Sequence, residues 1–147
     1  MIRRQKVDFD KVTNRINCLR DIPDRVEGIE LIVLFGSLAA GRPQPLSDID
    51  VAFQVVNLDR TKRAEIWGQT TDALGTDEVD IVYLNDDLPY CLKYEIGWSG
   101  RLLYEASPGL FSLFRVRAAA MWYDFKPYAD YRREKFFEHI RKVGIGK

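Results

Sequence analysis

Polar and apolar side chains alternate in residues 47–55, and this alternation limits the folds open to the chain. One face of the segment carries three large apolar residues: Ile49, Val51 and Phe53. The other face carries Asp48 and Asp50, followed by Ala52. Successive side chains of a strand point to opposite sides, so this segment predicts a strand with one apolar face and one polar face. The two carboxylates should therefore project side by side.

Hydrophobic spacing and turn residues predict the remaining elements. The predicted strands are residues 29–35, 47–55, 79–84 and 100–105. The predicted helices are residues 8–20, 38–40, 60–74, 88–98 and 110–141, the last bent at Pro127. This order is typical of one compact α/β or α+β domain with a small sheet. We expect a single domain over residues 1–147, with a core at about 8–106 and a C-terminal helical segment at about 108–142.

Composition excludes several classes of protein. With 46% hydrophobic residues and no net charge, the chain can bury a core and is not of the disordered class. Its apolar runs, such as residues 31–35, are far shorter than the ~20 residues of a membrane helix. No secretory signal follows Met1, so we expect a cytoplasmic protein. The separation of Cys18 from Cys91 argues against zinc, and a lone His139 argues against Ser-His-Asp or Cys-His catalysis.

Charge is distributed unevenly along this neutral chain. Residues 3–20 are mostly basic, residues 48–87 are mostly acidic, and the chain is basic again from residue 115 to its end. The layout is compatible with an acidic, cation-binding centre framed by positive surface. It is equally compatible with solvated helix faces that simply carry charge. A motif has to decide between the two.

The deciding motif joins the end of one strand to the start of the next. Gly36-Ser37 follows the strand at 29–35, and ten residues later come Asp48 and Asp50. A glycine lets backbone and ligand approach closely, and the amides of a following helix can hold a phosphate. Two neighbouring carboxylates repel each other, so a proton or a cation must join them. Mg²⁺ prefers carboxylate and substrate phosphate oxygens, which fits a nucleotide bound with its metal.

A third carboxylate completes the set if the strand at 79–84 lies beside the strand at 47–55. Asp80 takes the face opposite to Val79, Ile81 and Tyr83. It could then share the same metal ions or accept the proton of an attacking hydroxyl. Two such ions can stabilise both the attacking and the leaving oxygen of an in-line displacement.

These residues resemble the signature of the DNA polymerase β-like nucleotidyltransferase superfamily. The chain looks most like its small minimal nucleotidyltransferase (MNT) group, the antitoxins of HEPN–MNT toxin–antitoxin pairs. The residues that carry the resemblance are Gly36, Ser37, Asp48, Asp50 and Asp80, within residues of about 9–105. The resemblance implies the nucleotidyltransferase fold, with a small mixed β-sheet flanked by helices and followed by a helical segment.

The resemblance also implies an activity and a site. Gly36 and Ser37 would contact the triphosphate of ATP, Asp48 and Asp50 would bind one or two Mg²⁺ ions, and Asp80 would join the metals or act as base. Members of the family move AMP from ATP to a hydroxyl and release pyrophosphate. In the antitoxin group the acceptor is a tyrosine of a HEPN RNase toxin, which implies a hetero-oligomer of the two proteins.

Other functions remain open beside this interpretation. The chain could neutralise its partner by contact alone, or transfer a nucleotide to a small molecule. Basic residues among aromatics raise nucleic-acid binding as another class, although the neutral net charge and acidic centre weigh against it. Loss of Asp48 and Asp50 would stop transfer and leave nucleic-acid binding intact.

Two further patterns are better explained by structure than by chemistry. Arg42 could touch phosphates, but loops often carry free arginines. Residues 132–139 run from Arg to His as in HEPN RNases, yet too few helices surround them to build that bundle, and Phe136 and Phe137 should pack inward. Packing against the sheet should explain most of the aromatic residues at the start of the C-terminal segment: Trp122, Tyr123, Phe125, Tyr128 and Tyr131. Some of them could instead form a partner surface, because aromatic and Arg residues are favoured at interfaces. Tyr128 and Tyr131 are also conceivable sites of self-modification.

Overall fold

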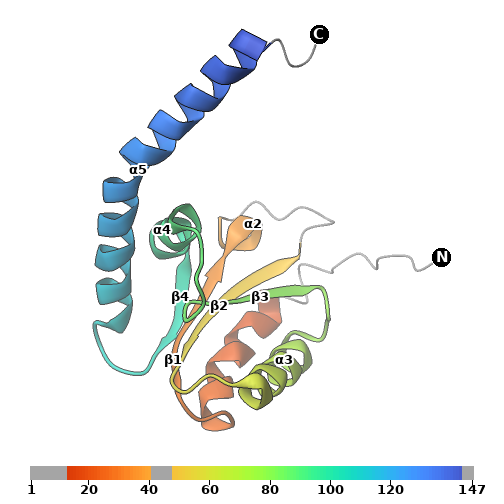
Figure 1. Ribbon diagram of the computed structural model, residues 1–147. Coiled ribbons are helices and arrows are strands. Elements are labelled where there is room, and N and C mark those ends of the chain that lie inside the picture. The colour runs from red at the N-terminus through yellow and green to blue at the C-terminus, as the bar shows by residue number, and fades with distance from the viewer. Residues whose placement is uncertain (1–12, 41–47, 144–147) are drawn as a thin grey trace, which may run out of the picture.

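The computed structural model of the protein describes residues 13–40 and 48–143, and its elements follow the predicted order (Figure 1). They are η1 (Ile16–Asp24), β1 (Ile29–Phe35), α2 (Gly36–Ala39), β2 (Ile49–Val55), α3 (Arg60–Leu74), β3 (Val79–Tyr83), α4 (Tyr90–Ser99), β4 (Arg101–Glu105) and α5 (Leu110–Val143). The predicted mixed α/β class is confirmed. In the described ranges no helix is both long enough and apolar enough to cross a bilayer.

The four strands form one mixed sheet in the order β3-β2-β1-β4. β1 runs antiparallel to β2 and to β4, whereas β2 runs parallel to β3. As a result the starts of β2 and β3 and the end of β1 meet at the same end of the sheet. Asp50, Asp80 and Gly36 come from these three places, so the topology brings the predicted site residues to one end of the sheet.

Each face of the sheet has its own apolar cluster. On one face η1 and α3 pack on a large core that includes Leu34, Val51 and Phe53. On the other face α4 and α5 cover a smaller core that includes Phe35 and Ala52. Figure 1 shows α3 on one side of the sheet and α4 and α5 on the other. Side chains two residues apart on a strand share a face, so Asp50 projects toward the α4 side, next to Ala52.

The first helical segment differs from its prediction. Sequence spacing predicts a helix over residues 8–20. In the structure residues 13–15 are α-helical and lead into the 3₁₀ helix η1, which continues to Asp24; residues 8–12 lie outside the described chain. Ile16, Leu19 and Ile22 are buried and recur every three residues. Three residues per turn is the period of a 3₁₀ helix, which stacks these side chains against the sheet.

Local capping explains the boundaries of α3, which is confirmed at residues 60–74. The Asp59 carboxylate accepts a hydrogen bond from the Lys62 amide at 2.7 Å, as an N-cap should. Gly75 ends the helix with a left-handed φ of +69°. The short helix α2 begins at Gly36, two residues before its predicted start, and Phe35 takes the N-cap position expected near Ser37. The predicted loop at 41–45, with Arg42, lies outside the described residues.

The aromatic residues of α5 divide into two groups. Trp122 and Phe125 pack on α4, where Trp122 stacks on Tyr94 at 6.2 Å and Phe125 meets Tyr90 edge-on at 5.1 Å. Tyr123 also meets Tyr94 edge-on, at 5.9 Å, although it is largely exposed. The expectation of inward packing is wrong for the exposed residues that follow: Tyr128, Tyr131, Phe136 and Phe137. Figure 1 shows the reason, because α5 changes direction partway along and its C-terminal half leaves the body of the protein.

Thr70 provides a test of the packing between α3 and the sheet. Its side chain is fully buried, and its hydroxyl Oγ1 has no hydrogen-bond partner among the described residues. We expect Thr70→Val to raise the free energy of unfolding by about 1 kcal/mol, because it removes an unsatisfied buried hydroxyl at nearly constant shape. Urea denaturation measures the change. Thr71→Val is the control, since that hydroxyl donates to the Trp67 carbonyl at 3.0 Å; a less stable Thr70→Val protein would contradict the account.

Candidate active site

Two of the predicted carboxylates lie side by side on adjacent strands. Asp50 of β2 and Asp80 of β3 are direct partners in the parallel register. Partners in neighbouring strands point to the same face, which here is the α4 side. Asp48 precedes β2 by one residue and lies two residues from Asp50. The sequence-based expectation that the strand at 79–84 lies beside the strand at 47–55 is therefore confirmed.

The electrostatics of Asp50 reflect this crowding. Its pKa is raised from 3.8 to about 6. The largest cause is burial, which disfavours the charged carboxylate. Repulsion by other carboxylates adds to the rise in pKa, in decreasing order from Asp80, Asp48 and Glu95. A charge that its surroundings disfavour to this extent favours binding of a proton or a cation.

Gly36 touches the same carboxylate from the other side. It follows Phe35, which is the register partner of Asp50 in the antiparallel pair β1–β2. Its φ is +77°, and a Cβ at this position would overlap Oδ2 of Asp50. Only glycine combines this φ with such a close approach at no steric cost. The predicted link between the Gly-Ser turn and the Asp-x-Asp pair is thus a direct contact at Gly36, and Ser37 follows within α2.

Glu95 is a fourth acidic residue of the site, and sequence reasoning missed it. It lies on α4 next to Ile96, whose buried side chain packs on the same sheet face as Ala52. Its charge is close enough to contribute to the raised pKa of Asp50. The available signal was helical spacing: Leu92 and Ile96 mark the side of α4 that packs on the sheet, and Glu95 flanks it.

The donor set fits Mg²⁺ bound together with a substrate. Within residues 13–40 and 48–143, no three His, Cys, Asp or Glu side chains gather closely enough to enclose a metal ion on their own. Such an enclosure is not what Mg²⁺ requires, because it usually binds one or two carboxylates and completes its shell with water and substrate phosphates. Asp50 and Asp80 supply the neighbouring carboxylates, with Asp48 beside them.

Comparisons with known proteins agree with this geometry. The sequence matches the family described as Polymerase beta, Nucleotidyltransferase over residues 17–109. No curated protein matches the sequence. A solved structure of the toxin–antitoxin MntA-HpeT mutant Y104A is 27% identical, with a TM-score of 0.67, and the match covers 85% of this chain and 97% of that one.

Two further solved structures share the fold. One is a toxin–antitoxin with AMP-PNP, at 24% identity and a TM-score of 0.66, with 88% of this chain and 98% of that chain covered. The other is a tri-AMPylated *Shewanella oneidensis* HEPN toxin in complex with MNT antitoxin, at 23% identity and a TM-score of 0.65, with 86% and 98% covered. The predicted nucleotidyltransferase fold is confirmed.

Proposed function

We infer that this chain, which belongs to the Polymerase beta nucleotidyltransferase family, transfers AMP from ATP to a hydroxyl of a partner protein. The acceptor we propose is a tyrosine of a HEPN toxin, which the transfer silences, so that the chain acts as the antitoxin. The observation that carries this proposal is the contact of Gly36 with Asp50, at the end of the sheet where Asp50 and Asp80 are paired.

The solved relatives support the choice of substrate and partner. One similar structure contains AMP-PNP, and another is an MNT antitoxin in complex with an AMPylated HEPN toxin. ATP as nucleotide and a HEPN protein as partner are proposed for this chain on that basis. The proposed reaction consumes ATP, which makes the cytoplasm its natural location.

In the proposed reaction the site residues bind the metal and the nucleotide, and Asp80 has a second role as base. Asp48, Asp50 and Asp80 would hold one or two Mg²⁺ ions, which when bound neutralise charge on the triphosphate. Gly36, lacking a side chain, would leave room for a phosphate beside Asp50, and we propose that the Ser37 hydroxyl donates a hydrogen bond to it. Asp48 and Asp50 orient the nucleotide, so that positioning and electrostatics supply most of the rate.

The transfer itself balances without any further reagent. A bond forms between the acceptor oxygen and the α-phosphorus of ATP, and the bond from that phosphorus to the oxygen shared with the β-phosphate breaks, so that this oxygen leaves with pyrophosphate. The proton of the acceptor hydroxyl goes to a carboxylate, for which we propose Asp80, since it faces Asp50 across the two strands. Pyrophosphate carries the leaving charge.

Mass spectrometry of the partner tests this proposal. The chain is co-expressed with a HEPN protein of the same organism, and the intact mass of that protein is measured. We expect wild type to add one or more whole AMP units to a tyrosine, and Asp48→Ala/Asp50→Ala to add none. Asp72→Ala/Asp87→Ala removes two exposed acidic residues elsewhere and should modify like wild type. An unmodified partner that still forms a complex with wild type would favour neutralisation by contact alone.

A further inference from the structure

The C-terminal half of α5, residues 126–143 (called distal α5 below), is an unusual element for a free surface. Figure 1 shows it extending away from the rest of the described chain. Large apolar side chains on it are exposed: Tyr128 by 67%, Phe136 by 60%, Phe137 by 52% and Val143 by 57%. A helix of this length is marginal in water unless its apolar side is packed against something. We therefore expect another surface to pack against the apolar side chains of distal α5.

Four apolar side chains of distal α5 form a seam along one side of the helix, whereas the exposed Tyr128, Tyr131 and Phe137 lie outside this seam. Ala129, Phe136 and Val143 follow one another at intervals of seven residues, and Ile140 lies between the last two. Residues seven apart share one side of a helix. The same side of the preceding half carries Ala118 and Trp122, eleven and seven residues before Ala129, and there it packs inward or on α4. The seam thus continues a packing surface that the protein already uses.

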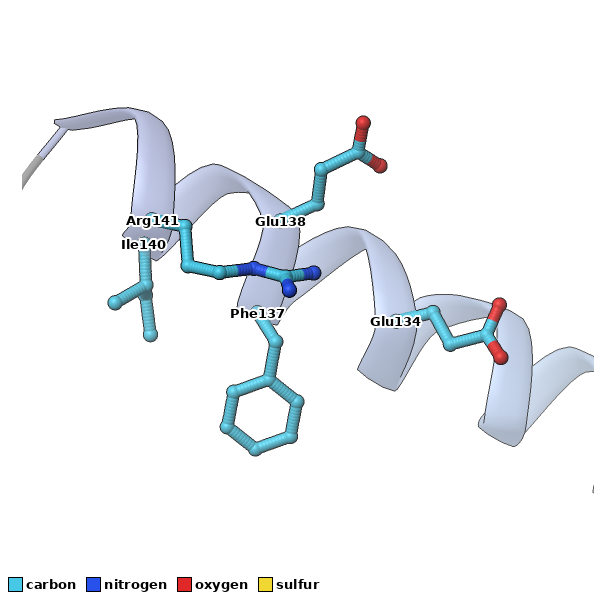
Figure 2. Close-up of a pocket in the computed structure, with 5 residues that line it drawn as sticks. All are labelled: Glu134, Phe137, Glu138, Ile140 and Arg141. Atoms are coloured by element: carbon cyan, nitrogen blue, oxygen red, sulfur yellow. The ribbon is translucent and has the colours of Figure 1, made fainter.

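A seam of this width suits a second helix. Apolar positions at heptad intervals are the pattern by which one helix packs along another, whereas a helix that lies on lipid presents a broad apolar face. A shallow hollow borders the seam at Ile140, and its other lining residues are Glu134, Phe137, Glu138 and Arg141. Figure 2 shows Phe137 and Ile140 projecting from one side of the helix and Glu138 from the other. The hollow therefore extends from the seam toward the acidic side of the helix.

The charges around the seam indicate what that helix carries. Arg132 and His139 occupy the heptad positions between the apolar ones, and Arg133 borders the seam on its other side. The acidic residues Asp130 and Glu134 lie together with Glu138 on a different side, four residues apart. Glu138 is paired along the helix with Lys135 at 3.5 Å and Lys142 at 3.7 Å. Basic groups therefore surround the seam, which favours an acidic occupant.

The net charge of the segment argues against a second copy of this chain. Distal α5 carries six basic and three acidic side chains. Two copies packed along this seam would bring two positive segments together, and like charges at an interface oppose association. A partner of the opposite charge gains attraction from the same arrangement.

We propose that distal α5 is the docking surface for the partner protein, and that it binds an amphipathic helix whose apolar seam is bordered by acidic side chains. This inference rests on the proposed function only for the statement that the docked protein also carries the acceptor hydroxyl. Docking holds that protein against the face of the molecule on which α4 and Asp50 lie. It raises the effective concentration of the acceptor without taking part in the chemistry.

Measurements of binding and of transfer together test the proposal. The probe is the HEPN protein used in the co-expression experiment above. The seam variant is Phe136→Ser/Ile140→Ser and the charge variant is Arg132→Glu/Arg133→Glu. Leu113→Ser/Val116→Ser is the matched control, because these residues are 46% and 66% exposed on the first half of α5. We expect both test variants to weaken binding by about tenfold or more, and the control to bind like wild type. Added salt should weaken the wild-type complex and narrow its difference from the charge variant.

Kinetics separate docking from catalysis. We expect the seam variant to raise the KM for the partner while kcat at saturating partner stays near that of wild type. Wild-type transfer with equal affinity in all variants would overturn the docking proposal and leave the enzyme proposal standing. If binding requires Phe136 but wild type transfers nothing, the enzyme proposal is overturned and the docking proposal stands.

Two separate measurements detect the other occupants that the seam could have, which are a second copy of this chain and a lipid surface. Sedimentation of the chain alone reports a second copy: a wild-type dimer that the seam variant loses would overturn the proposal. Vesicles of anionic phospholipid report a lipid surface: seam-dependent binding to them, with partner affinity unchanged in the seam variant, would overturn it as well. We expect a monomer at micromolar concentration and no seam-dependent vesicle binding.

Discussion

Replacing Asp50 by Asn should abolish transfer and at the same time make the ligand-free protein more stable. Transfer requires the Asp50 charge to hold the nucleotide with its metal, and we expect the rate to fall by at least about a thousandfold. Stability should rise because burial and three neighbouring carboxylates disfavour this charge in the folded protein. Activity and stability thus change in opposite directions, which simple misfolding cannot produce.

The pH dependence of stability shows in which direction the Asp50 charge changes the free energy of unfolding. The pKa of Asp50 is raised in the folded protein, to about 6 from 3.8, so the folded state holds the proton more tightly than the unfolded state. The contribution of the Asp50 carboxyl to the free energy of unfolding is fully present below about pH 4 and is lost as the pH rises through about 6. If fully expressed, the shift would be worth about 3 kcal/mol, and solvent around the half-buried carboxyl reduces it to about 1 kcal/mol.

Denaturation of wild type and Asp50→Asn across this pH range measures the difference. We expect the two proteins to be equally stable near pH 4. Above pH 6 the free energy of unfolding of Asp50→Asn should exceed that of wild type by about 1 kcal/mol. Asp87→Asn, which changes an exposed acid on the loop before α4, serves as the control and should show no such trend. A wild type that gains stability over Asp50→Asn between pH 4 and 7 would contradict the account.

Replacing Gly36 by Ala should damage both stability and activity. Alanine at a φ of +77° costs about 1–2 kcal/mol, and its Cβ would displace the Asp50 carboxylate. Because displacement of a catalytic group by about 1 Å can cost a hundredfold in rate, we expect a loss of that size or more. Thermal unfolding and the transfer assay report the two effects.

A matched glycine and a double mutant make this prediction specific. Gly68 lies within α3 with no atom near the position of an added Cβ, so Gly68→Ala should stabilise the protein by about 0.5–1 kcal/mol. In an Asp50→Ala background, Gly36→Ala should cost only the strain of its φ, because the overlapping carboxylate is gone. Equal costs of Gly36→Ala in both backgrounds would show that the contact between the two residues is not what matters.

Much of this site could be predicted from the sequence because its signals are local. Alternation in residues 47–55 places Asp48 and Asp50 on one face, and Gly36 marks a turn that needs a positive φ. The sequence also suggested Asp80, but the direction of β3 beside β2 depends on how the whole chain is connected. Only the parallel register makes Asp80 the partner of Asp50.

The features that escaped prediction depend on long-range packing. Glu95 belongs to the site because α4 packs on the sheet beside Ala52; helical spacing places Glu95 next to the packed side of α4, but it does not indicate which part of the sheet that side meets. Phe136 and Phe137 were expected to face inward because apolar spacing indicates a packed side. It does not say whether the surface that packs there belongs to this chain. The same spacing that made the expectation wrong is the basis for the docking proposal.

The position of the label in ATP tests the central claim most directly. The purified chain, Mg²⁺ and the HEPN protein of the co-expression experiment are incubated with ATP labelled at either the α-phosphate or the γ-phosphate. Wild type and Asp50→Asn are compared in parallel. We predict that wild type moves only the α-label to the partner, releases the γ-label as pyrophosphate, and that Asp50→Asn moves neither. Transfer of the γ-label, or retention of the α-label in free nucleotide while the partner is still neutralised, would contradict nucleotidyl transfer by this site.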